Sequence, residues 1–122
     1  MAAFTSSDVT ISLDPRDRHI LGKIKMAKCS IAFGNGVLTY TTGGVPMPAI
    51  GLFGMNKEVI GMNWLEGMGN SANGFIYKYD VTNRKILIYY ADYDAVADGP
   101  LIELPNGNAP AAATLIAAVW GK

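Results

Sequence analysis

Short segments of alternating apolar and polar residues recur along this chain, and glycine or proline separates them. Residues 9–13, VTISL, alternate apolar with hydroxyl side chains, and residues 58–65, EVIGMNWL, form another apolar-rich run. Residues 19–33, HILGKIKMAKCSIAF, predict one long strand, or two strands separated by a bulge near residues 27–29. A period of two is typical of strands with one buried face, so the patterning predicts an all-β protein.

The clearest predicted element is a hairpin over residues 74–90, GFIYKYDVTNRKILIYY. Two runs rich in aromatic and β-branched residues flank a turn that contains Asp80 and Asn83. Asp can hydrogen-bond its own backbone in such a turn, and Asn tolerates a left-handed conformation. The return strand, residues 85–90, is apolar on both faces, which predicts that it is covered on two sides.

The final apolar segment, residues 114–120, TLIAAVW, is also apolar on both faces. Its alanines suit a helix over residues 111–118, but its β-branched residues and its place after a series of strands favour a strand. One helical turn is expected within residues 49–56, after Pro48. About seven or eight short strands with glycine and proline turns predict an antiparallel β-sandwich or a barrel.

A dense run of backbone-controlling residues, VLTYTTGGVPM, lies between the predicted strands. We expect a strand over residues 37–40 that leaves its sheet through Gly43 and Gly44. Pro46 and Pro48 would hold the exit extended and prevent further ladder pairing. This segment is therefore predicted to be a corner where the chain crosses from one sheet to the other.

The composition suits one small domain with an uncharged surface. The chain has 122 residues, of which 16% are charged and 50% hydrophobic, whereas about 25% of an ordinary soluble domain is charged. We expect an N-terminal arm over residues 1–8 and a single domain over residues 9–122. Part of the outer surface must be uncharged, as in a protein that packs against neighbours in an assembly.

The charge balance argues against nucleic acid as a partner, and the short apolar runs argue against a membrane. Ten basic and ten acidic residues give a formal net charge of zero, and no apolar run is long enough to span a bilayer. On a strand the clustered basic residues would point to different sides and form no single patch. These residues are Arg16, Arg18, His19, Lys23, Lys25 and Lys28.

The search for catalytic chemistry yields no catalytic residue, metal site or cofactor. The chain has one histidine, His19, and one cysteine, Cys29, which cannot assemble a zinc site or a nucleophilic triad. The acidic segment 91–100, with Asp92 and Asp94, is interpreted as a solvated loop, with weak cation binding or catalysis as alternatives.

Three motifs in a fixed order resemble a known family. They are RHILGKIKMAKCSIAFG at residues 18–34, YTTGGVPM at residues 40–47 and GFIYKYDVTNRKI at residues 74–86. Together they resemble the small head decoration, or cement, proteins of tailed bacteriophages. The resemblance implies a jelly-roll-like β-sandwich that binds the capsid exterior as a homodimer or homotrimer and clamps subunits of the major capsid protein. The protein would be made in the host cytoplasm and carried on the virion.

For such a protein the sequence suggests contact residues with the capsid or with other copies. We expect Phe4 in the arm, together with exposed Met62, Trp64 and Met68, to form this interface, and removal of residues 1–8 to leave the fold intact. The sequence leaves open dimer or trimer, the capsid site and the contacting face.

Two alternative functions remain open. A β-sandwich could present Tyr89, Tyr90 and Tyr93 to a carbohydrate, as a tail or host-surface adhesin without catalysis would. A small hydrolase could instead use Asp92 and Asp94 of the acidic segment.

Overall fold

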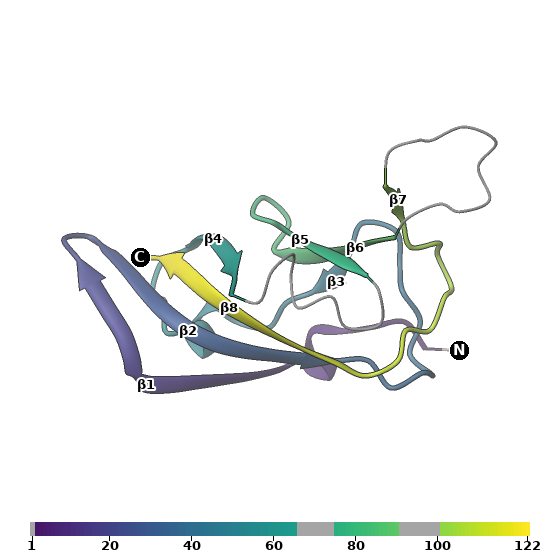
Figure 1. Cartoon of the computed structure of the whole chain (residues 1–122), viewed down its shortest axis with the longest axis horizontal. Helices are drawn as coiled ribbons and strands as arrows, with labels where there is room; N and C mark the ends of the chain where they lie inside the picture. Colours follow the sequence, from purple (N-terminus) through teal and green to yellow (C-terminus); the bar gives the residue numbers. More distant parts are fainter. Residues whose placement is uncertain (1, 66–74, 91–100) are drawn as a thin grey trace.

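The protein folds as two antiparallel sheets that form a sandwich (Figure 1). The computed structural model describes residues 2–65, 75–90 and 101–122, with the backbone alone at residues 14–17 and 21. The larger sheet has the strand order β1-β2-β8-β4, and the smaller has the order β3-β6-β5, with β7 also paired to β6. The strands are β1 (Thr10–Leu21), β2 (Ile24–Phe33), β3 (Val45–Pro46), β4 (Val59–Trp64), β5 (Ile76–Asp80), β6 (Lys85–Tyr90), β7 (Ile102–Glu103) and β8 (Ala113–Gly121).

These elements confirm the predicted all-β sandwich and several individual strands. The hairpin within residues 74–90 is β5–β6, residues 58–65 contain β4, and the final apolar segment is a strand rather than a helix. Helical structure among the described residues is limited to two short 3-10 turns. One of them is η1 (Ser6–Asp8), and the other is η2 (Ile50–Phe53), the helical turn expected after Pro48.

The segment 19–33 differs from both expectations, because it contains a hairpin. β1 ends at Leu21, which pairs with Ile24, so Gly22 and Lys23 form a two-residue loop. Gly22 has φ +64, and a left-handed glycine in the first central position suits such a tight loop. The irregularity also lies elsewhere than predicted: it falls in β1 between Leu13 and Arg18, and not near residues 27–29.

The β5–β6 turn is stabilised by Asp80, as expected. Its Oδ1 accepts hydrogen bonds from the backbone N–H groups of Thr82 (3.1 Å) and Asn83 (3.3 Å), and its Oδ2 accepts one from the Asn83 side chain (2.8 Å). The Asn83 amide is the largest cause that lowers the pKa of the Asp80 carboxyl. The left-handed residue is Arg84 (φ 54), one position after the predicted Asn83.

The VLTYTTGGVPM segment crosses between the sheets as predicted, although its pairing differs. Residues 37–40 form no strand; Thr39 makes only an isolated parallel bridge with Ala3. Beyond the left-handed Gly43 and Gly44, pairing resumes, because Val45–Pro46 forms β3 against β6. Pro46 is tolerated there because β3 is an edge strand, where a missing N–H breaks no central ladder.

A buried tyrosine anchors this corner. The Tyr40 side chain is fully buried, and its hydroxyl donates a hydrogen bond to Glu103 Oε2 (2.7 Å) while it accepts one from the backbone N–H of Ile88 (3.3 Å). Glu103 Oε2 also accepts the backbone N–H of Gly43 (2.8 Å). Burial, with the hydrogen bond to Glu103, strongly raises the pKa of Tyr40. The corner, β6 and β7 therefore share one polar network.

Replacing Tyr40 by phenylalanine is expected to lower the free energy of unfolding by about 1–3 kcal/mol, because Glu103 loses a donor and the buried N–H of Ile88 loses its acceptor. Urea denaturation measures this difference. The matched control is Tyr79→Phe, since the Tyr79 hydroxyl has no hydrogen-bond partner among the described residues and should change stability little. Equal effects of the two substitutions would contradict a structural role for the Tyr40 network.

Candidate interaction surface

Phe4, expected in an exposed arm, lies in the core. Its side chain is only 6% exposed, and its ring contacts Phe33 edge-to-face with 6.1 Å between centroids. The backbone N–H of Phe4 donates to the Thr39 carbonyl (3.1 Å), and the N–H of Thr39 donates to the Ala2 carbonyl (2.9 Å). The N-terminal segment therefore contributes a core ring and backbone pairing, and we now expect its removal to destabilise the fold.

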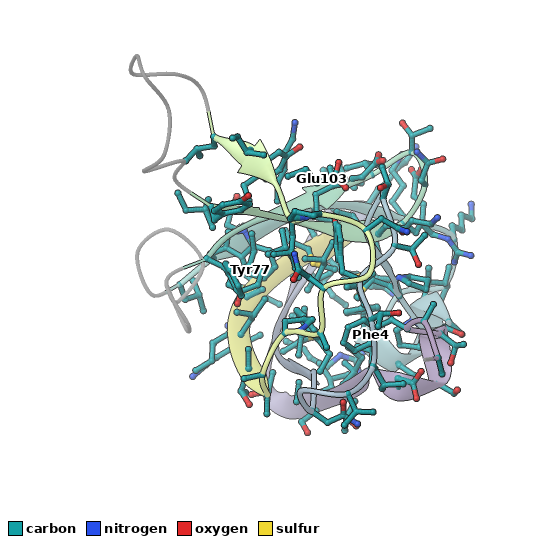
Figure 2. The ribbon with its side chains drawn as sticks, turned by 90° about the vertical axis from the view of Figure 1, so that its right-hand side faces the viewer. Phe4, Tyr77 and Glu103 are labelled. Carbon is teal, nitrogen blue, oxygen red and sulfur yellow. The ribbon has the colours of Figure 1, made fainter. Side chains whose placement is uncertain are left out.

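Trp64 is half-buried and joins the two sheets. Its indole N–H, on β4, donates to the carbonyl oxygen of Tyr77 on β5 (2.9 Å), and the two rings contact with centroids 6.5 Å apart. Tyr77 in turn contacts Phe33 edge-to-face at 6.1 Å. Aromatic rings thus run continuously from Phe4 through the core to Trp64. Figure 2 looks along the long axis and shows Phe4 and Tyr77 on the inner side of the strands.

The other proposed contact residues have mixed placements. Met62 is half-buried and, like Trp64, packs against the core rather than projecting from the surface. Met68 lies outside the described residues. The sequence therefore placed the interface on side chains that, where described, mainly hold the sandwich together.

Burial of Tyr77 predicts a loss of stability in alkali. Burial raises the pKa of Tyr77 from 10.0 to about 12, so above pH 10 the folded chain binds more protons than the unfolded chain. Stability from this residue is complete below pH 10 and is lost as the pH rises toward 12. We expect a decrease of roughly 2 kcal/mol over this range, measured by urea denaturation. A Tyr77→Phe variant should show a shallower decrease; an identical pH dependence would contradict the assignment.

The side of the larger sheet that faces away from the core carries an apolar surface. Along β2 and β8 the odd-numbered positions, such as Ile31 and Leu115, are buried in the core, so the even-numbered ones point away from it. On β4, Met62 and Trp64 pack on the core, which turns Asn63 outward. We call the outward set on β2, β4 and β8 the outer face. It comprises Ile24, Met26, Lys28, Ser30, Ala32, Asn63, Leu65, Thr114, Ile116, Ala118 and Trp120.

The outer face has a single charged side chain, Lys28. Trp120 belongs to this face and is half-buried among its neighbours. The indole N–H of Trp120 is buried and has no hydrogen-bond partner among the described residues. Leu65 and Ile24 at its margins are 49% and 38% exposed. Both figures show the smaller sheet on one side of the larger sheet, and the outer face is on the other side. Apolar side chains on an exposed sheet surface are typical of a protein contact.

Sequence reasoning missed Trp120 and Ile116, although a signal was present. The segment 114–120 was expected to be apolar on both faces, and a central strand with two apolar faces needs two covers. One cover is the core, which buries Leu115, Ala117 and Val119. The other side of β8 carries Ile116 and Trp120 on the outer face.

Comparison with known proteins gives no relative of this chain. No protein-family model, curated protein or solved structure matches it. Among the described residues, no three His, Cys, Asp or Glu side chains lie together as metal ligands would. No helix in the described part of the chain is long and apolar enough to cross a membrane. The candidate surface therefore rests on the geometry of this chain alone.

The tyrosines considered for carbohydrate binding are only partly described. Tyr89 and Tyr90 are half-buried on β6, whereas Tyr93 and the acidic residues Asp92, Asp94 and Asp98 lie outside the described residues. Tyr90 lines a groove of about 280 Å³, whose other described lining residues are Phe75, Leu104, Asn108, Ala109 and Pro110.

Proposed function

We propose that this chain is a bacteriophage virion structural protein that decorates the outer capsid surface and stabilises the head by clamping subunits of the major capsid protein. The observation that carries the proposal is the outer face, a sheet surface with one charge among eleven side chains on β2, β4 and β8. The ordered motifs that resemble head decoration proteins, and the charge-poor composition, support the same function.

The size of the outer face suggests how such a protein would bind. Three strands spaced about 4.8 Å apart, each rising about 3.3 Å per residue over some nine residues, give a surface of roughly 430 Å². A standard protein interface buries about 800 Å² on each partner, so one face alone would bind weakly. Several copies held together would bind far more tightly through avidity, which supports the proposal of a homodimer or homotrimer.

A substitution on the outer face tests this proposal. We expect Leu65→Glu to weaken binding to purified heads at least tenfold, because it places a charge where the contact excludes water. The change should hardly alter the melting temperature of the free protein, since Leu65 is 49% exposed. The measurement is co-sedimentation with heads assembled without the protein.

The matched control is Val37→Glu, the same kind of change at a residue that is 60% exposed and lies off the outer face. Equal binding of the two variants would contradict the role of the outer face. Absence of the protein from purified virions, or heads whose heat stability does not depend on it, would overturn the function itself.

A carbohydrate-binding module is the second candidate, and the groove beside Tyr90 is the observation that favours it. Two aromatic residues, Tyr90 and Phe75, line the groove together with Asn108, and sugar sites commonly combine a stacking ring with an amide. Glycan-array binding that disappears in both Tyr90→Ala and Tyr93→Ala would favour this function. A signal that survives both substitutions, or no glycan signal, would count against it.

A further inference from the structure

A cleft lies where the β1–β2 hairpin meets the segment that follows η2. Its volume is about 310 Å³, at the lower end of the range for small-molecule sites. Its walls combine basic and apolar side chains. The described lining residues are Arg18, His19, Ile20, Lys25, Met26, Ala27, Gly54 and Met55.

The hairpin register brings two cations to the same side of the sheet. Arg18 pairs with Ala27, and Ile20 pairs with Lys25, so Arg18 and Lys25 are diagonal neighbours. Ala27 is buried on the core side, which places both cations on that side. The clustered basic residues thus point to different sides, as expected, but Arg18 and Lys25 share one of them. Lys28, by contrast, lies exposed on the outer face.

The two cations have no acidic partner among the side chains that the structure describes, which leave out those of Asp14 and Asp17. Neither Arg18 nor Lys25 makes an ion pair with a described carboxylate, and no described carboxylate lines the cleft. Like charges at diagonal positions on a sheet repel each other, so an anion between them would remove an unfavourable interaction.

Gly54 holds the guanidinium of Arg18 at the wall of the cleft. A Cβ on Gly54 would lie 3.5 Å from Nε and 3.6 Å from Nη2 of Arg18, so the guanidinium lies beside Gly54. Gly54 has φ +81 and ends η2, a conformation that favours glycine. The planar donors of arginine match the two oxygens of a carboxylate.

We propose that this cleft binds an organic acid, through a carboxylate between Arg18 and Lys25 and a short apolar chain against Ile20 and Met55. The apolar walls distinguish this ligand from an inorganic anion, which would gain nothing from them. Arg18 and Lys25 lie on the core side of the larger sheet, and of the outer face only Met26 also lines the cleft. The site does not depend on the proposed function.

An NMR titration of the ¹⁵N-labelled protein at low ionic strength tests the proposal with three probes. Sodium hexanoate should shift the amide resonances of Ala27, Gly54 and Met55 in a saturable way. Hexanamide, which has the same chain without the charge, should not shift them. Sodium phosphate, which has charge without the chain, should bind at least tenfold more weakly than hexanoate. Phosphate binding as tight as hexanoate binding, or no saturable shift with hexanoate, would overturn the proposal.

Matched variants locate the binding site. Arg18→Gln should raise the Kd for hexanoate at least tenfold and Lys25→Gln at least threefold, whereas Lys28→Gln should change it less than twofold. Lys25→Gln and Lys28→Gln remove the same charge from the same strand, on opposite faces. Equal effects of these two variants would overturn the assignment to the cleft. Lys25→Gln carries the test if Arg18→Gln fails to fold.

Discussion

Replacing Phe4 by alanine is expected to lower the free energy of unfolding by about 3–4 kcal/mol. The Phe4 ring is 6% exposed and packs edge-to-face on Phe33, so its removal leaves a cavity between the N-terminal segment and the larger sheet. Equilibrium urea denaturation measures the change. Leu52→Ala is the control, because Leu52 is 51% exposed and its truncation creates no cavity.

The Leu52→Ala control is expected to stay within about 0.5 kcal/mol of the parent protein. If Phe4→Ala behaved like this control, the N-terminal segment would be a separable arm after all. The structure also predicts that deletion of residues 1–8 is worse than the point substitution, because it additionally removes the hydrogen bonds that join Phe4 and Ala2 to Thr39. A binding assay on such a truncation would therefore report loss of folding.

Replacing Gly44 by alanine is expected to destabilise the protein by about 3 kcal/mol or more, because two penalties combine. Gly44 has φ +117, which L residues rarely adopt. A Cβ there would also lie 2.9 Å from Lys85 Cβ and 3.0 Å from the Ile86 carbonyl oxygen. The corner would have to move away from β6, and the pairing of β3 with it. Thermal and urea unfolding both measure the loss.

Two neighbouring glycines separate these penalties. Gly43 has φ +105 but open space around its missing Cβ, so Gly43→Ala should show the backbone penalty alone, about 1–2 kcal/mol. Gly51 has neither a left-handed φ nor a close neighbour, so Gly51→Ala should be nearly neutral. Equal losses for Gly43→Ala and Gly44→Ala would show that the close approach to β6 contributes nothing.

The strands predicted best were those whose pattern is local. β4, the β5–β6 hairpin and β8 each show their apolar residues within one short segment, and each formed where expected. The β1–β2 hairpin was missed because its loop has only two residues. After such a loop the even-numbered positions face the other side of the sheet: Ile20 and Lys25 share a side, whereas Ile24 and Met26 point the opposite way. The apolar residues nevertheless stay at even positions through the loop, so the alternating pattern gives no sign of the turn.

The candidate surface was harder to predict because its residues depend on distant partners. Phe4 is buried only because Thr39 pairs with the segment beside it, and Trp64 is held only because Tyr77 offers a carbonyl oxygen. Neither partner follows from local spacing. The outer face could be anticipated only in part, since the two-sided apolar pattern of residues 114–120 indicated a second cover without showing which side would stay open.

The central position of β8 also sets the order in which the fold can be completed. β8 lies between β2 and β4, and its first residue, Ala113, pairs with Phe33 of β2. Until β8 is in place, β2 and β4 each present an unpaired backbone edge, and such edges recruit strands from other chains. Closing contacts this distant in sequence is slow. The most aggregation-prone form of the protein should therefore be the chain that lacks β8, whether during synthesis or during refolding.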